Sequence, residues 1–183
     1  MTAPHDQGRT SLPSGACVDY KLLAQQIREL ARDERLWLPT LANMCAVLWE
    51  ALPGINWCGF YLVDAKRGDK EDMCAVPELV LGPFQGKLAC VRIPFGTGVC
   101  GTAAAHDCVQ LVANVHEFSG HIACDAASKS EIVLPIHKDY EVIGVLDIDA
   151  PEYGRFGKTD REGLLGCVKA LEESCATATL PLS

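Results

Sequence analysis

The sequence lacks an excess of basic residues. Its 183 residues include 16 Lys and Arg against 24 Asp and Glu, which gives a formal charge of −8. Counterion release on nucleic acid and attraction to anionic lipid both need clustered Lys and Arg. We therefore expect neither nucleic acid nor a membrane surface among the partners of this protein.

Long apolar runs are also missing. No stretch approaches the ~18 apolar residues of a membrane span, and the first residues, MTAPHDQGRTSLPSGA, lack the basic start and apolar run of a secretory signal. We therefore expect a cytoplasmic protein, whose thiols the glutathione and thioredoxin systems keep reduced. With 49% hydrophobic residues the chain has room for one domain with a substantial core.

The paired cysteines of structural zinc sites are absent as well. Ten cysteines are present, but none stand at the short two-to-four spacing of such sites. Most should be small core residues, because free cysteine is among the most buried residue types. We expect no metal, although His116, His121 and His137 could supply ligands to Cys124 as an alternative.

Apolar periodicity predicts helices and strands in an order typical of an α+β domain, in which helices pack against a central antiparallel sheet. Residues 1–18 are predicted to be a flexible tail, and residues 19–183 a single domain. Asp19 is the expected cap of the first helix, and Thr159 or Asp160 that of the last. The predicted helices cover 19–30, 39–52, 98–106 and a final segment after 159; the predicted strands cover 56–63, 79–81, 88–93, 109–112, 131–137 and 141–149, with a turn at 83–86 and loops at 65–77 and 114–129.

Three cysteines stand beside turns or a helix start. Cys90 closes GPFQGKLAC, Cys100 lies in the first turn of the predicted helix after PFGTG, and Cys124 closes SGHIAC in the long loop. Backbone amides and a helix dipole favour a thiolate, which is the nucleophilic form of the residue. The alternative for each is an ordinary packing residue, and for Cys100 and Cys90 taken alone that alternative is preferred.

Acidic and aromatic residues share faces of the predicted strands. Asp147 and Asp149 are two residues apart in an otherwise apolar strand, so both carboxylates face one side, and Glu131 could add a third from the neighbouring strand. Like charges at close range need a cation, either an ammonium group or a metal. Trp57 and Tyr61 flank Gly59 on one strand face, which predicts a concave apolar wall for a small molecule.

Four segments together resemble the free methionine-(R)-sulfoxide reductases, enzymes built on a GAF domain. The segments are INWCGFYLV, ELVLGPFQGKLACVRIPFGTGVCGTAAA, HEFSGHIACDAASKSEIVLPI and VIGVLDIDAPEYGRF. The resemblance runs from Tyr20 to Glu173. It is more specific than any single motif, because the three cysteines and the acidic strand recur in the expected order.

The resemblance implies a GAF-like fold, commonly a homodimer, and a role for each matched position. Cys124 would take the sulfoxide oxygen and become a sulfenic acid, Cys90 would resolve it as a disulfide, and Cys100 would be a second exchanging thiol. A thioredoxin-type dithiol would reduce the disulfide, without metal or organic cofactor. The residues implied in binding free methionine sulfoxide are Trp57 and Tyr61 at the methyl sulfoxide end and Glu131, Asp147 and Asp149 at the polar end.

Two other functions fit the same residues. A GAF fold also occurs in ligand-sensing modules, so a binding or redox-sensing domain without turnover is the main alternative. A thiol hydrolase is less well supported, since no His and Asx pair is placed to activate Cys124. The remaining seven cysteines are expected to be buried or incidental, with Cys74 on a polar loop as a possible partner in thiol exchange.

Overall fold

The computed structural model describes residues 17–64, 76–118, 120 and 127–179. Within them, six strands form one antiparallel sheet in the order β3-β2-β1-β6-β5-β4. The helices are α1 (Tyr20–Leu30), α2 (Trp37–Ala51), α3 (Gly98–His106), α4 (Lys158–Ser174) and a 3-10 turn, η2 (Val115–Glu117). The strands are β1 (Trp57–Val63), β2 (Glu78–Gly86), β3 (Arg92–Pro94), β4 (Gln110–Val112), β5 (Ser130–Lys138) and β6 (Glu141–Ala150).

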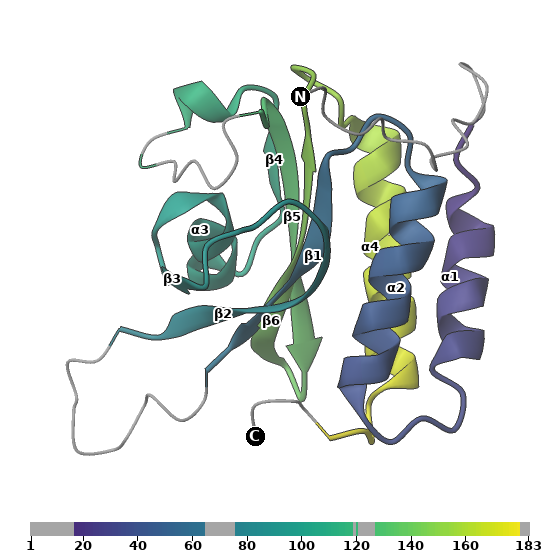
Figure 1. Cartoon of the computed structure of the whole chain (residues 1–183). Helices are drawn as coiled ribbons and strands as arrows, with labels where there is room; N and C mark the ends of the chain where they lie inside the picture. Colours follow the sequence, from purple (N-terminus) through teal and green to yellow (C-terminus); the bar gives the residue numbers. More distant parts are fainter. Residues whose placement is uncertain (1–16, 65–75, 119, 121–126, 180–183) are drawn as a thin grey trace, which may run out of the picture.

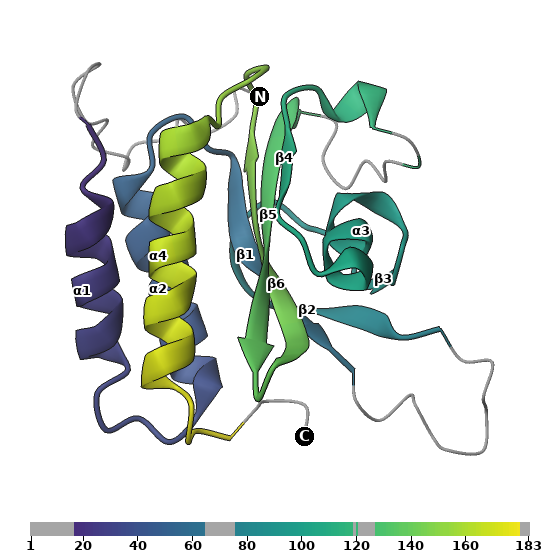
Figure 2. The same ribbon diagram turned by 180° about the vertical axis from the view of Figure 1, so that it is seen from behind.

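The sheet is covered by helices on both faces. Helices α1, α2 and α4 form a layer on one face, and α3 lies against the other, as Figures 1 and 2 show from opposite sides. The predicted α+β architecture is therefore confirmed. None of the described helices has the length and apolar character needed to cross a lipid bilayer.

Strand β1 lies near the middle of the sheet and divides its side chains between two cores. Cys58, Phe60 and Leu62 point into the large core under the three-helix layer. Trp57 and Tyr61 point into the smaller core under α3. This alternation follows from the two-residue period of a strand and confirms the predicted assignment of the two faces.

Two of the four predicted helix starts agree with the structure and two differ. Helix α3 begins at Gly98, as predicted. The Oδ1 atom of Asp19 accepts a hydrogen bond from the Leu22 amide at 3.0 Å, so the predicted cap of α1 is confirmed. Helix α2 begins at Trp37, two residues before Pro39. The helix tolerates Pro39 in its first turn, because an amide at that position would have no intrahelical partner. Helix α4 begins after Gly157, whose amide donates to Asp160 at 2.8 Å, so the predicted cap at 159 or 160 is wrong.

The predicted turn at 83–86 is wrong. Strand β2 continues through these residues and pairs with β1 as far as Gly86, with an irregular register between Gly59 and Tyr61. Pro83 falls in that irregular stretch, where a missing amide costs no ladder hydrogen bond. The chain then leaves the sheet at residues 87–91, which form a connecting segment. Only Arg92 and Ile93 of the predicted 88–93 strand are therefore strand, and β3 extends one residue further, to Pro94.

Several predictions concern residues outside the described ranges. The tail at 1–18 is described only for its last two residues, and of the 65–77 loop only the last two residues are described. Of the 114–129 loop, the structure describes η2 and a few flanking residues. Cys74, His121 and Cys124 are all outside, so their predicted roles remain predictions.

Candidate active site

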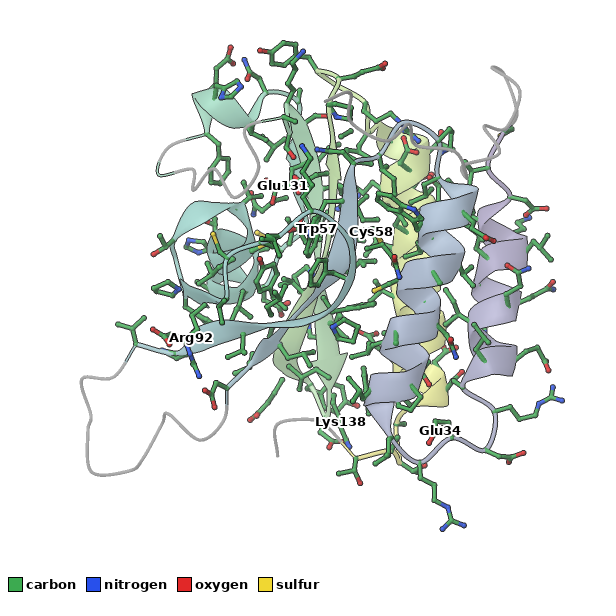
Figure 3. All side chains as sticks on the ribbon, viewed as in Figure 1. Glu34, Trp57, Cys58, Arg92, Glu131 and Lys138 are labelled. Carbon is green, nitrogen blue, oxygen red and sulfur yellow. The ribbon has the colours of Figure 1, made fainter. Side chains whose placement is uncertain are left out.

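A pocket lies between the sheet and α3, on the face opposite the three-helix layer. It is an open cleft with about 540 Å³ of empty space, which includes solvent at its mouth. Figure 3 shows Trp57 and Glu131 on this side of the sheet and Cys58 on the other. The lining residues are Trp57, Tyr61, Leu88, Ala89, Ile93, Thr97, Gly98, Val99, Cys100, Ser128, Glu131, Asp147 and Asp149.

The two aromatic residues of β1 hold the 87–91 segment against the sheet. The indole Nε1 of Trp57 donates to the Lys87 carbonyl at 3.1 Å, and the Tyr61 hydroxyl donates to the Cys90 carbonyl at 3.0 Å. Burial raises the pKa of Tyr61, and the acidic residues nearby raise it further, so the phenol remains a donor. Both aromatic residues thus position the backbone that carries Cys90, a role that the sequence did not indicate.

The predicted concave gap between Trp57 and Tyr61 is wrong. The two rings stack with centroids 5.9 Å apart, and Phe84 also stacks with Trp57, with centroids 5.4 Å apart. A Cβ added to Gly59 would lie 2.5 Å from Cη2 of Trp57 and 2.4 Å from Cβ of Phe84. The indole therefore lies over the glycine and fills the space, so the aromatic pair forms a closed wall.

Three carboxylates are brought together by the register of the central strands. Asp149 lies opposite Trp57 on β1 and Glu131 on β5, and Asp147 lies one step along the same face, opposite Gly59. All three line the pocket. Glu131 and Asp147 are each only 6% exposed. The predicted acidic cluster thus exists, and two of its members are more deeply buried than their spacing in the sequence indicates.

Burial favours the protonated forms of two carboxyl groups in this cluster. Desolvation raises the pKa of Glu131 well above its usual range, and the charges of Asp147 and Asp149 raise it further. Desolvation also raises the pKa of Asp147 to about 6, although hydrogen bonds with Cys100 and Glu131 oppose the rise. Oδ1 of Asp147 is buried and has no hydrogen-bond partner in the described part of the chain. The cluster is therefore an acceptor for a proton-bearing or cationic group.

Cys100 faces the carboxylates from the first turn of α3. Gly98 begins the helix with a φ of 63°, and Gly101 brings it so close to β3 that an added Cβ would lie 2.3 Å from the Pro94 carbonyl oxygen. Sγ of Cys100 donates to Oε1 of Glu131 at 3.8 Å. Desolvation and the neighbouring carboxylates raise the thiol pKa well above its usual range, so the predicted helix-dipole thiolate is wrong for this arrangement.

Cys90 is disulfide-bonded in this structure. The seven other described cysteines are free thiols, so its partner lies outside the described residues. The structure brings together every predicted substrate-binding residue with Cys100 around one pocket, and it places the Cys90 backbone beside Tyr61. It does not describe Cys124.

Sequence reasoning missed several residues of the pocket. The side-chain Nδ2 of Asn56 donates to Oγ of Ser128 at 3.0 Å, which ties the chain entering β5 to the chain entering β1. Leu88 lines the pocket yet is 89% exposed. The exposure of this apolar residue, close to the predicted reactive Cys90, marks it as part of an open site. Exposure cannot be read from the sequence alone.

Metal-ligating atoms gather at one place among the described residues. Cys100, Glu131 and Asp147 each offer one ligand atom, and these atoms lie within 4.8 Å of one another. Of the histidines predicted as alternative zinc ligands, His137 instead contacts Asp107 at 2.7 Å and Glu172 at 3.0 Å. His116 packs edge-on against Tyr153.

Known proteins share this sequence and architecture. A GAF domain family model matches residues 20–172. The free methionine-R-sulfoxide reductase of Escherichia coli is 52% identical over 158 residues, which are 86% of this chain and 89% of that protein. A structure of the Staphylococcus aureus fRMsr in complex with substrate superposes with a TM-score of 0.78 at 50% identity and covers 88% of this chain and 98% of that one.

A third relative is a free methionine-R-sulfoxide reductase from Neisseria meningitidis, solved in complex with its substrate. It is 42% identical, has a TM-score of 0.79, and covers 93% of this chain and 98% of that one. These matches extend over nearly all of the described fold, including the sheet and the helix that enclose the pocket. The chain therefore belongs to the GAF domain family, in the group that contains the free methionine-R-sulfoxide reductases.

Proposed function

We propose that this protein reduces free L-methionine-(R)-sulfoxide to L-methionine by thiol chemistry. The observation that carries the proposal is the pocket that joins a buried carboxylate cluster to an aromatic wall. Two similar structures were solved with substrate, and the chain covers nearly all of each. The activity of those relatives and the chemistry of this pocket lead to the same reaction.

The carboxylates suit the polar end of a free amino acid. An ammonium group can donate to the unpartnered Oδ1 of Asp147 and compensate the like charges of Asp147 and Asp149. A peptide-bound substrate has no ammonium group at this position and would leave buried charge uncompensated. We therefore expect discrimination against N-acylated substrates.

Glu131 is the group best suited to hold the proton that the reaction needs. A sulfoxide accepts a thiol at sulfur only when its oxygen is protonated or strongly hydrogen-bonded. The raised pKa of Glu131 favours the protonated form of its carboxyl group, which lines the pocket.

The thiol steps follow the assignment made from the resemblance. Cys124 attacks the sulfoxide sulfur, the sulfur–oxygen bond breaks, and the products are methionine and a Cys124 sulfenic acid. Cys90 then displaces water from the sulfenic acid to form a disulfide, and Cys100 is a second thiol for exchange. A thioredoxin-type dithiol returns the disulfide to two thiols and is itself oxidised.

The cellular location, oligomeric state and partners of the enzyme are part of the same proposal. A thioredoxin-type donor requires a reducing compartment, so we propose a cytoplasmic enzyme. From the family resemblance we also propose that the enzyme acts as a homodimer. Neither nucleic acid nor a membrane is proposed as a partner, consistent with the net charge of −8.

A coupled assay tests the reaction. NADPH consumption is followed with thioredoxin, thioredoxin reductase and free L-methionine-(R)-sulfoxide, beside the S epimer and an N-acetylated form. We expect turnover of the free R epimer alone, and its loss in Cys124→Ser. Binding of the R epimer without turnover would indicate a sensor module, and wild-type turnover by Cys124→Ser would refute the mechanism.

A further inference from the structure

We propose that the reduced protein binds one Zn²⁺ ion through Cys100, Glu131 and Asp147, and that the ion blocks the substrate site. The binding itself depends only on these three side chains. The blocking rests on the proposed function, because the ion would occupy the place assigned to the substrate ammonium group.

The spacing of the donor atoms suits a tetrahedral ion. The three ligand atoms lie within 4.8 Å of one another, and Sγ of Cys100 is 3.8 Å from Oε1 of Glu131. Zinc bonds of ~2.3 Å to sulfur and ~2.0 Å to oxygen separate two tetrahedral ligands by about 3.5 Å. Only a few tenths of an ångström of adjustment are needed between these two atoms.

The donors are held by three different elements that pack together. Cys100 comes from α3, Glu131 from β5 and Asp147 from β6, and none of the three is more than 6% exposed. Rotamer freedom is small at such buried positions, so little ordering accompanies binding. The pocket leaves the remaining coordination position open to water.

An independent observation points to a ligand here. Oδ1 of Asp147 is buried without a hydrogen-bond partner among the described residues, and such atoms in native proteins are usually satisfied by a bound group. An ammonium group would satisfy this oxygen but would not form a bond to the sulfur of Cys100. One thiolate with two carboxylates is a donor set for Zn²⁺, whereas Mg²⁺ and Ca²⁺ prefer oxygen alone.

Binding involves proton release and no electron transfer. The ion forms a bond to sulfur as the Cys100 proton leaves to solvent, and any proton on Glu131 leaves with it. The ion must therefore bind more tightly as the pH rises. An oxidised Cys100 offers no thiolate, so only protein in which Cys100 itself is reduced is sensitive to zinc.

Cobalt provides a direct spectroscopic test. Co²⁺ is titrated anaerobically into reduced, metal-free protein, and the near-ultraviolet sulfur-to-cobalt charge-transfer band is recorded. We expect one ion per chain, displacement by Zn²⁺, loss of the band in Cys100→Ser, and retention of the band in the exposed control Cys108→Ser. An undiminished band in Cys100→Ser overturns the proposal.

A second variant tests the same site in case Cys100→Ser does not fold. Asp147→Asn keeps the sulfur and removes one charged ligand, and we expect at least a tenfold weaker Zn²⁺ affinity in a chelator competition. An unchanged affinity also overturns the site.

The reductase assay separates this inference from the proposed function. With metal-free enzyme we expect Zn²⁺ to raise KM for the sulfoxide and EDTA to reverse the effect. Turnover that Zn²⁺ leaves unchanged, in protein that binds no ion, overturns the zinc inference alone. One bound ion at Cys100 in a protein that never turns over the sulfoxide supports the metal site and refutes the reductase.

Discussion

Asp147 carries a buried carboxylate whose Oδ1 has no partner within the described part of the chain. Its pKa of about 6 exceeds the ordinary value of 3.8, so the folded state holds this proton more tightly than the unfolded chain does. Stability contributed by such a group is present at low pH and is lost as the pH rises from about 4 through about 6. At this residue, substrate recognition and stability therefore oppose each other.

Asp147→Asn should be more stable and a poorer enzyme. We expect a gain on the order of 2 kcal/mol at pH 7.5, because the neutral amide avoids the desolvated charge. KM for the free sulfoxide should rise at least tenfold, because the ammonium group loses a charged acceptor. Thermal melts from pH 4 to 8, beside the steady-state assay, measure both effects.

A matched control is Asp139→Asn, at an exposed position in the turn between β5 and β6. It should change neither KM nor the melting temperature appreciably. A less stable Asp147→Asn with an unchanged KM would contradict our account of this residue.

Tyr61→Phe tests the hydrogen bond that holds the Cys90 backbone. The variant keeps the stacked ring but removes the 3.0 Å donor to the Cys90 carbonyl. We expect disulfide formation to slow on the order of fivefold in a single turnover, the equivalent of about 1 kcal/mol for one hydrogen bond. Rapid quenching with a thiol-blocking reagent measures the rate.

The comparison for Tyr61→Phe is Tyr140→Phe, which removes the hydroxyl of a fully exposed tyrosine. It should form the disulfide at the wild-type rate. Equal rates for Tyr61→Phe and the wild type would show that the hydrogen bond does not position Cys90 for the reaction.

At the scale of elements, the approach of α3 to β3 sets the depth of Cys100. Gly101 allows it, because a Cβ there would meet the Pro94 carbonyl oxygen at 2.3 Å and the Gly96 amide nitrogen at 3.3 Å. These are backbone atoms, which cannot move aside as the end of a side chain can. The position of α3 above the carboxylate cluster therefore depends on the absence of a side chain at Gly101.

Gly101→Ala should push α3 outward. We expect a loss of about 1–3 kcal/mol in the free energy of unfolding and a faster reaction of Cys100 with a thiol reagent. Gly166→Ala in α4 is the control, because that glycine is exposed and has no atom within 4 Å of an added Cβ. There the same change should stabilise by about 0.5–1 kcal/mol, since alanine is the better helix former. Destabilisation of equal size in both variants would disprove the close-approach argument.

At the scale of the whole molecule, His137 on β5 ties together elements from both faces of the sheet. Its ring bonds Asp107, which follows α3, and Glu172 of α4, whose carboxylate also accepts from the His137 amide. Burial lowers the pKa of His137, but the bonds with Asp107 and Glu172 outweigh this effect and raise it overall. The charged ring therefore stabilises the folded state below its unfolded pKa, and this contribution is lost as the pH rises through the higher folded value.

His137→Gln should cost more stability in acid than in base. We expect a larger melting-temperature difference from the wild type at pH 6 than at pH 8.5, because the charged form of the wild-type ring is less populated at the higher pH. The half-exposed site is screened by solvent, so the effect is expected to be small. A pH-independent difference would indicate a packing role only. Reductase activity at saturating substrate provides a control, because the group lies outside the pocket.

The sequence by itself determined the α+β class, the two faces of β1 and the grouping of Glu131, Asp147 and Asp149. These depend on local rules, because a strand period of two places alternate side chains on one face wherever the strand lies. The same rule led to the wrong concave gap at Gly59, since it says nothing of how far an indole extends along its own strand.

Only the tertiary structure decided the protonation of Cys100. A helix start favours a thiolate, but burial raises the pKa of the Cys100 thiol, and the two buried carboxyl groups that the register of β5 and β6 places beside it raise the pKa further. The path of residues 83–91 was likewise set by pairing with β1 and by hydrogen bonds from Trp57 and Tyr61. Such interactions join residues that are distant in the chain, so their strength depends on separations that exist only after folding.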